Sequence, residues 1–167
     1  MDTPDETKAQ RKPDYSWDEE TLEEFRKDVL KENDFKCKTD DIFLLSFLRA
    51  RKFNRERALT LLKNYYLTRK KYPVLYKNLK PSALEESLRQ NALSCVKTEN
   101  DTVITLFSFG HWDATKVGIV DMLRAVLLSA DFELNNHPIQ VNGYYVLFDA
   151  RIYRGDILFS TLQEIFN

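Results

Sequence analysis

Arginine and lysine are concentrated in one stretch of the sequence, residues 51–80, where they could bind anions. This stretch carries ten basic residues and one acidic residue, whereas residues 1–50 carry nine and fourteen, and residues 81–167 carry six and eleven. Guanidinium groups suit phosphate because they offer two parallel N–H donors to two oxygens. The net charge of −1 hides this asymmetry. The basic block is either the solvated face of a helix or an anion-binding surface.

Side chains that could bind a metal or carry out catalysis are scattered. His111 and His137 have no companion at metal-ligand spacing, and Cys37 and Cys95 form neither a metal-binding pattern nor a disulfide framework. No phosphate-binding loop, dinucleotide fingerprint, zinc-protease or serine-hydrolase motif occurs. We therefore predict that the protein is not an enzyme and holds no metal or cofactor. The following aspartates are too far apart in the sequence to indicate an acid–base pair: Asp101, Asp113, Asp121 and Asp149.

Composition is typical of a soluble globular protein, with 43% hydrophobic and 31% charged residues. No apolar run approaches the roughly 18 residues of a membrane span. The opening residues, MDTPDETKAQRKPDYSW, are polar and do not form a signal peptide. We expect a cytoplasmic monomer with reduced cysteines.

The elements that position the basic block are predicted to be helices. Residues 1–15 are expected to be disordered. Ser16 and Glu19 have the spacing of a capping box, Asn54 suits a helix N-cap, and Pro73 ends the helix that follows. Helices are predicted over residues 17–32, 39–52, 54–72 and, as a shorter element, from Pro81 to about 92.

The second half of the chain alternates strands and helices. Strands are predicted over Thr102–Phe109 and Val141–Phe148, and helices over Val117–Ala130 and residues 156–166. Strands that are apolar on both faces indicate a mostly parallel sheet covered by helices, so the fold class is α/β. The first of these helices is predicted to bury Val120, Leu123, Leu127 and Leu128.

Four sequence segments together resemble the CRAL-TRIO family of lipid-transfer proteins. They are DDIFLLSFLRARKFNRERALTLLKNYYLTRKKYP, GHWD, DMLRAVLLS and QVNGYYVLFD, in the family's order and spacing from Ile42 to Asp149. The resemblance is strongest to the branch of alpha-tocopherol transfer protein and cellular retinaldehyde-binding protein. It implies an all-helical amino-terminal segment over residues 16–92, followed over residues 93–167 by the first part of an α/β lipid-binding domain.

The resemblance also implies a function and a set of ligand-binding residues. A member of this family is a carrier that buries one small hydrophobic ligand and exchanges it at membranes. From spacing alone, the corresponding residues could equally be ordinary core residues. The positions that correspond to the family's pocket are Phe107, Leu123, Val126, Leu127, Ala130, Tyr144 and Leu147.

A second implied site would bind acidic phosphoinositide headgroups during transient, peripheral association with endomembranes. The family's Arg-Ala-Arg element corresponds to Arg49-Ala50-Arg51, which makes Arg51 the principal candidate, with Lys52 and Arg55 beside it. The alternative is that Arg49 or Arg51 pairs with acidic residues of the adjacent domain.

The sequence departs from the family pattern at several points. Ser46 replaces a common arginine, and Asp149-Ala150-Arg151 replaces the usual residues after the second strand. The family pattern continues beyond Asn167 with further strands and a gate helix. We therefore expect a lipid domain that ends partway, and weak or absent binding if the chain is a complete short product.

The sequence allows two other functions to be considered. A helical adaptor would bind a protein partner or an acidic membrane without any ligand. A nucleic-acid role is disfavoured because the flanks of the basic block are acidic and no recognition motif accompanies it.

Overall fold

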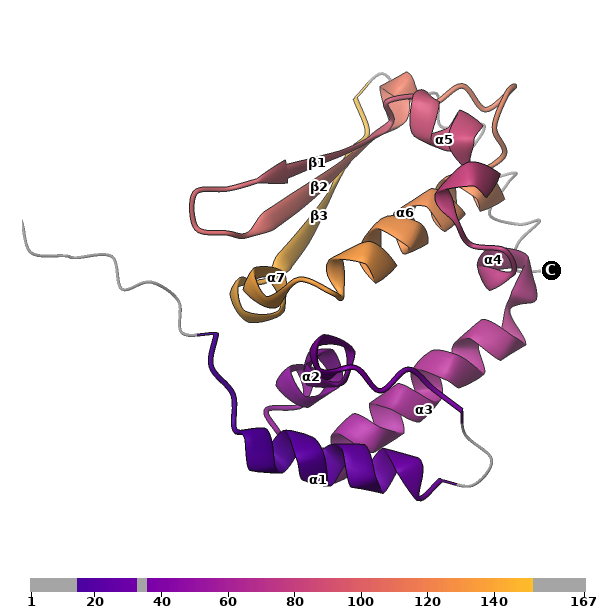
Figure 1. Cartoon of the computed structure of the whole chain (residues 1–167). Coiled ribbons are helices and arrows are strands. Elements are labelled where there is room, and N and C mark those ends of the chain that lie inside the picture. The colour runs from indigo at the N-terminus through magenta and orange to yellow at the C-terminus, as the bar shows by residue number, and fades with distance from the viewer. Residues whose placement is uncertain (1–14, 33–35, 152–167) are drawn as a thin grey trace, which may run out of the picture.

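The computed structural model describes residues 15–32 and 36–151. The disorder expected for residues 1–15 lies outside these residues except at Tyr15, and the helix expected over residues 156–166 lies outside them entirely. Figure 1 shows helices α1 to α3 packed together, with α6 and α7 between them and a small sheet. The α/β fold class is confirmed. The division into domains at residue 92 stays a prediction.

Three amino-terminal helices form the larger core: α1 (Glu19–Leu30), α2 (Asp41–Ala50) and α3 (Arg55–Lys71). The middle helix is the most apolar, and all residues from Phe43 to Leu48 are buried. Leu22, Phe25 and Val29 of α1 lie at helical spacing and pack against it. Helix α3, the predicted basic helix, buries Ala58 and Leu62 in this core, while its opposite face lies in solvent.

The starts of α3 and α1 test the two N-caps predicted from the sequence. Asn54 caps α3 as predicted, because its side chain accepts a hydrogen bond from the Arg57 amide at 2.9 Å. The prediction for α1 is wrong by two residues, since Asp18 rather than Ser16 is the N-cap and accepts from the amides of Glu20 and Thr21. A carboxylate adjacent to the helix can reach both amides and also suits the positive end of the helix dipole.

Short elements connect the helices to the sheet. Pro73 ends α3 as predicted and begins a further short helix, α4 (Pro73–Tyr76). A 3-10 turn at Pro81–Ala83 and helix α5 (Glu85–Arg89) take the place of the single short helix expected after Pro81.

The sheet has three strands in the order β1-β2-β3: β1 (Leu93–Lys97), β2 (Val103–Ser108) and β3 (Tyr144–Asp149). Strands β2 and β3 are parallel, whereas β1 and β2 are antiparallel, so the described sheet is mixed. Strand β1 was not predicted. It is exposed along most of its length, and therefore lacks the buried positions that make a strand visible in a sequence.

The connection from β2 to β3 contains α6 (Ile119–Glu133) and α7 (His137–Asn142). The strand predicted to start at Val141 begins instead at Tyr144, because Val141 and Asn142 end α7. Gly143 separates the two elements with a φ of 102°, a backbone conformation that residues other than glycine rarely adopt.

The buried face of α6 differs from the predicted one. Ile119, Met122 and Ala125 are buried, while Leu123 is 37% exposed. Met122 packs into a cluster with Phe107 and Val117, and this contact sets the rotation of the helix.

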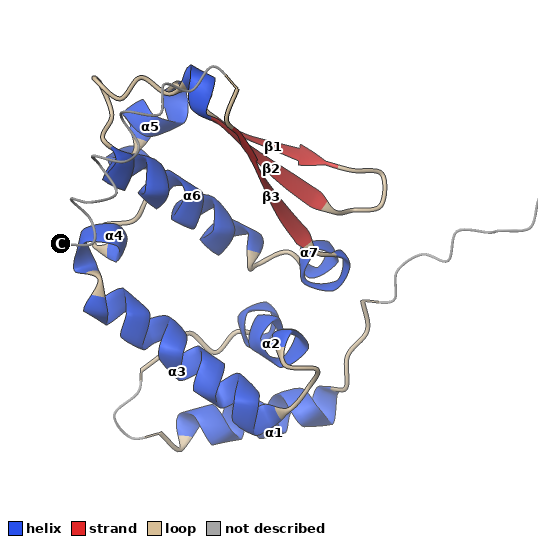
Figure 2. Ribbon diagram, turned by 180° about the vertical axis from the view of Figure 1, so that it is seen from behind, coloured by secondary structure: helices blue, strands red, loops and turns tan. Residues whose placement is uncertain are grey.

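One face of the sheet faces α6 and the other does not (Figure 2). Phe107 and Cys95 lie on the α6 side, where the Cys95 thiol is 3.5 Å from the hydroxyl of Ser129 in α6. Because side chains alternate along a strand, Leu147 and Tyr145 lie on the opposite side. There they are 52% and 58% exposed within the described part of the chain.

Candidate functional site

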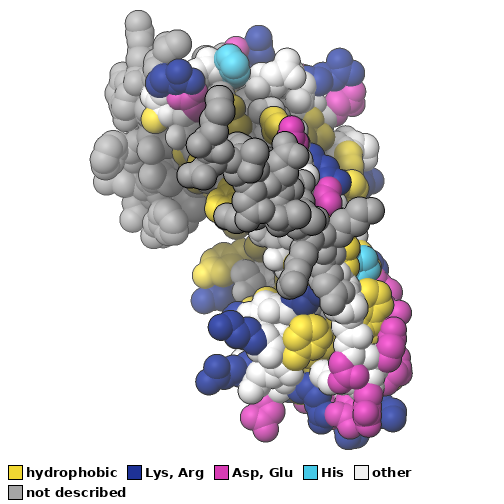
Figure 3. Space-filling model, turned by 90° about the vertical axis from the view of Figure 1, so that its left-hand side faces the viewer, with side chains coloured by type: hydrophobic (Ala, Val, Ile, Leu, Met, Phe, Trp, Pro, Cys, Tyr) yellow, Lys and Arg dark blue, Asp and Glu magenta, His cyan; other side chains and the backbone are white. Residues whose placement is uncertain are grey.

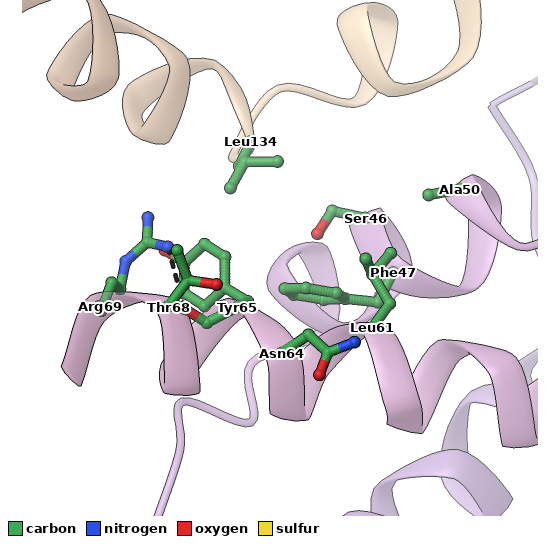
Figure 4. A pocket seen from close by; sticks show the side chains of 9 residues that line it. All are labelled: Ser46, Phe47, Ala50, Leu61, Asn64, Tyr65, Thr68, Arg69 and Leu134. Carbon is green, nitrogen blue, oxygen red and sulfur yellow. Dashed lines mark hydrogen bonds between the residues drawn. The ribbon is translucent and has the colours of Figure 1, made fainter. Parts of the chain in front are cut away.

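Two adjoining hollows lie between the amino-terminal helices and the α6–α7 region. Their volumes are about 310 and 360 Å³, and they share Ser46, Ala50 and Leu134. Figure 4 shows the second hollow, with Leu134 pointing from the end of α6 toward side chains of α2 and α3. The first hollow is lined in addition by Arg49, Ala130, Glu133, Ile139, Gln140 and Tyr144.

Arg49 joins the two sides of the first hollow. Its guanidinium donates to the Gln140 side-chain oxygen at 2.6 Å and to the Tyr15 carbonyl at 2.9 Å. Gln140 in turn donates to the carbonyls of Ile42, at 2.8 Å, and Leu134, at 2.6 Å. These bonds connect α2, α7, the end of α6 and the segment before α1. Arg49 therefore contacts the adjacent part of the fold through neutral groups, and not through the acidic residues considered from the sequence.

An aromatic pair covers this junction. The rings of Trp17 and His137 are stacked, with centroids 5.1 Å apart and planes 5° from parallel. The Arg49 guanidinium lies over the Trp17 ring and 3.0 Å from Nδ1 of His137. Burial, with a smaller effect of the Arg49 charge, lowers the pKa of His137. His137 thus packs within the junction between α2, α7 and the segment before α1.

A second polar contact closes the other hollow. Arg69 of α3 forms an ion pair with Asp131 of α6 and lies against the ring of Tyr65, 3.2 Å from its centroid. The Tyr65 hydroxyl donates to the same carboxylate at 3.3 Å. Burial, and next the negative charge of Asp131, raise the pKa of Tyr65. One end of the apolar hollow is therefore fixed by a charged pair that spans the two parts of the fold.

The structure brings together only some of the predicted ligand-binding residues. Ala130 and Tyr144 line the 310 Å³ hollow. Phe107 belongs to the core cluster beneath α6, and Val126 packs against that cluster. The other predicted positions do not join them, since Leu127 is half-buried on α6, Leu123 is exposed on α6 and Leu147 lies on the opposite face of the sheet.

A row of polar side chains runs between α6 and the sheet, and sequence analysis missed it. Thr105 of β2 is completely buried and donates to the Tyr144 hydroxyl at 2.9 Å. The Cys95 thiol lies 3.3 Å from the Thr105 hydroxyl and 3.5 Å from the Ser129 hydroxyl. The only feature of the sequence that could have indicated this row is Thr105, a threonine in the middle of an apolar strand.

The predicted headgroup residues have different environments. Arg55 forms ion pairs with Asp28, at 3.0 Å, and with Glu24, so its charge is already paired with acidic residues of α1. Arg51 and Lys52 are exposed at the corner between α2 and α3 and form no ion pair with any described residue. On the face shown in Figure 3, most acidic side chains of the lower part lie at one edge, where basic ones are interspersed, and further basic side chains lie at the opposite edge.

The described residues contain neither a metal-binding cluster nor a membrane-spanning helix. No group of three or more histidine, cysteine, aspartate or glutamate side chains is arranged to hold a metal ion there. Of the helices that the structure describes, none is long and apolar enough to span a membrane.

Comparison with known proteins identifies relatives. No family model matches the chain. It is 36% identical over 114 residues to the alpha-tocopherol transfer protein-like protein of Homo sapiens, which covers 67% of this chain and 33% of the relative. It is 33% identical over 117 residues to clavesin-1 of Xenopus laevis and 32% identical over 117 residues to clavesin-2 of Rattus norvegicus, which cover 67% of this chain and 35% and 36% of those relatives.

The chain thus spans about a third of the length of the curated relatives that it matches. Its mixed sheet, with α6 between parallel strands and helices α1 to α3 before it, agrees with part of the fold expected from the sequence resemblance. On this sequence identity and this fold, the chain belongs to the CRAL-TRIO family.

Proposed function

We propose that this chain is part of a carrier that binds one small hydrophobic ligand and transfers it between membranes. The observation that carries the proposal is its 36% identity over 114 residues to proteins named alpha-tocopherol transfer protein-like. The relatives are longer, so their activity reaches this chain only as an inference. Endomembranes reached from the cytoplasm are the place where we expect transfer.

Burial of the ligand supplies the binding energy in this proposal. A ligand that buries about 400 Å² of hydrocarbon gains roughly 10 kcal/mol before ordering costs, at about 25 cal/mol per Å². The hollow of about 310 Å³ is close to the lower end of the size range of ligand pockets, about 300–1,000 Å³. Apolar binding of this kind needs few polar contacts.

We place the ligand on the α6 side of the sheet. Ala130 and Tyr144 would contact it directly, and Phe107, Val126 and Leu127 would form the apolar surroundings. Leu147 would lie outside this compartment because it projects from the other face of β3. Leu123 would reach the ligand only from the exposed side of α6.

The proposed contact with acidic membranes centres on Arg51 and Lys52. Both are exposed, and both lack an ion-pair partner among the described residues, so their charges are available to lipid phosphates. The ion pairs of Arg55 with α1 leave it as a structural residue. Anionic headgroups would promote ligand release only by binding an open form of the protein more tightly than the closed form.

A transfer assay tests the carrier function. Movement of a fluorescent tocopherol analogue between donor and acceptor vesicles should be faster with the protein than without it. Ala130→Phe, which fills the hollow, should slow transfer at least several-fold. Ala83→Phe is the matched control, because Ala83 is exposed in the turn before α5. Equal transfer with and without the protein would refute the carrier function.

A helical adaptor that binds an acidic membrane without a ligand is the second candidate. Arg51 and Lys52, which are exposed and form no ion pair within residues 15–32 and 36–151, favour it as much as they favour the carrier. Vesicle binding in the absence of any ligand transfer would support the adaptor. Ligand transfer that depends on Ala130 would exclude it.

A further inference from the structure

We infer that Tyr144 selects ligands that carry a neutral oxygen acceptor, such as a hydroxyl, ether or carbonyl group, over pure hydrocarbons. This inference rests on the proposed carrier function and assigns the chemical class of the ligand. It starts from the row of polar side chains between α6 and the sheet, formed by Ser129, Cys95, Thr105 and Tyr144.

The direction of the hydrogen bonds in this row is fixed from one end. Thr105 uses its only hydroxyl hydrogen to donate to the Tyr144 oxygen at 2.9 Å. Thr105 can therefore only accept from Cys95, and the thiol hydrogen of Cys95 points to it at a separation of 3.3 Å. Cys95 then accepts from Ser129, which lies 3.5 Å away. The row therefore ends at the Tyr144 oxygen, which accepts from Thr105.

The phenol hydrogen of Tyr144 is thus left at the end of the row. Among the residues that the structure describes, none accepts a hydrogen bond from this hydroxyl. Tyr144 also lines the 310 Å³ hollow, and in this inference its free donor is open to that hollow. A donor without an acceptor costs free energy when a hydrocarbon displaces water from it, whereas a ligand oxygen satisfies it.

The rest of the wall limits the ligand to neutral molecules. Ala50, Ala130, Leu134 and Ile139 present apolar surface to the hollow. Arg49 and Glu133 line the same hollow with opposite charges, which gives an ionic ligand no net attraction. A mostly apolar molecule with one oxygen therefore fits this wall better than a fatty acid anion.

A set of three probes tests this selection in the full chain. Farnesol carries a hydroxyl, farnesyl methyl ether carries an acceptor but no donor, and farnesene is the matching hydrocarbon. Binding would be measured by displacement of a fluorescent hydrophobic dye. We expect the alcohol and the ether to bind about three- to tenfold more tightly than the hydrocarbon, the range of one neutral hydrogen bond. Tyr144→Phe should remove this preference while it keeps hydrocarbon binding.

Tyr145→Phe is the matched control, because Tyr145 is the next residue of β3 and lies on the other face of the sheet. It should keep the preference of the wild type. Thr105→Val, which removes the bond that orients Tyr144, should reduce the preference even if Tyr144→Phe fails to fold.

The outcomes separate the two proposals. Equal affinity of the wild type for alcohol, ether and hydrocarbon would overturn the selection by Tyr144 and leave the carrier function intact. A preference that persists in a folded Tyr144→Phe protein would do the same. No binding of any probe to the wild type would overturn the carrier function, and the selection with it.

Discussion

Individual side chains join parts of this fold that are far apart in the sequence. Arg49 contacts Tyr15, His137 and Gln140, and it also lies over the ring of Trp17. In the sequence this arginine belongs to the Arg-Ala-Arg element, and the role considered for it was pairing with acidic residues of the adjacent domain. Its real partners are neutral and lie up to 91 residues away, so no local pattern could reveal them.

His137 makes this junction sensitive to acid. Its folded-state pKa is lowered from the ordinary 6.5 by burial and by the charge of Arg49, so the unfolded chain binds a proton more readily than the folded one. The stability contribution is complete above about pH 6.5 and is lost as the pH falls through the folded-state pKa. We expect the free energy of unfolding, measured in urea, to decrease from pH 7.5 to 5.5.

His137→Phe is the control for this prediction, since a phenyl ring can still stack on Trp17 but cannot be protonated. The decrease in stability between these pH values should be smaller in the variant than in the wild type. An equal or larger decrease in the variant would show that His137 is not the responsible group.

At the scale of elements, a sequence pattern predicts well where burial or capping is local. The start of α3 at Asn54 and its end before Pro73 follow from residue type alone. Strand β1 is held by its ladder to β2 and has little buried surface, so its sequence carries no alternation. The segment starting at Val141 looked like a strand because it is apolar, yet its first residues complete a helical turn before Gly143.

The rotation of α6 about its own axis is set by a tertiary contact and not by the apolar pattern of its sequence. Several stripes of its sequence are apolar, and the sequence alone cannot choose between them. The structure selects the stripe with Met122 because Phe107 and Val117 offer it a complementary surface.

Two neighbouring substitutions test this rotation. Met122→Ala should lower the free energy of unfolding by about 2–5 kcal/mol, because Met122 is fully buried and its loss leaves a cavity. Leu123→Ala should cost less than about 1 kcal/mol, because Leu123 is 37% exposed. Urea denaturation of both variants measures the difference. A larger loss for Leu123→Ala would support the rotation predicted from the sequence and contradict the observed one.

At the scale of the whole molecule, the hollows lie where the amino-terminal helices meet α6 and α7. Their walls come from elements that are distant in the sequence, which explains why only Ala130 and Tyr144 of the predicted ligand residues line them. Family resemblance pointed to α6 and β3, and two of the predicted residues, Ala130 and Tyr144, line a hollow there. It could not indicate which side chains face the hollow, because that depends on how the parts pack.

Charge is also distributed over the whole molecule. The basic block predicted from residues 51–80 is partly neutralised by ion pairs of Arg55, Lys63 and Arg69 with acidic residues of α1, of the segment that follows it and of α6. The exposed corner at Arg51 and Lys52 keeps its charge.

We expect this corner to bind vesicles that contain phosphoinositides, and binding to weaken as salt screens the charges. Arg51→Gln should reduce vesicle affinity about fivefold, because one basic residue near an anionic surface contributes roughly 1 kcal/mol. Arg89→Gln removes the same charge from α5, where the side chain is 71% exposed and pairs with Glu85, and should have little effect. Equal losses in both variants would show that only net charge matters.

The central claim is that the space between α6, α7 and the amino-terminal helices holds a hydrophobic ligand. Solvent extraction of the purified protein, followed by mass spectrometry, tests this claim most directly. The carrier function predicts a small hydrophobic molecule in an amount approaching one per chain, and its loss from Ala130→Phe. An extract of the wild type without any such molecule, from protein that also fails to take up added probe, would contradict it.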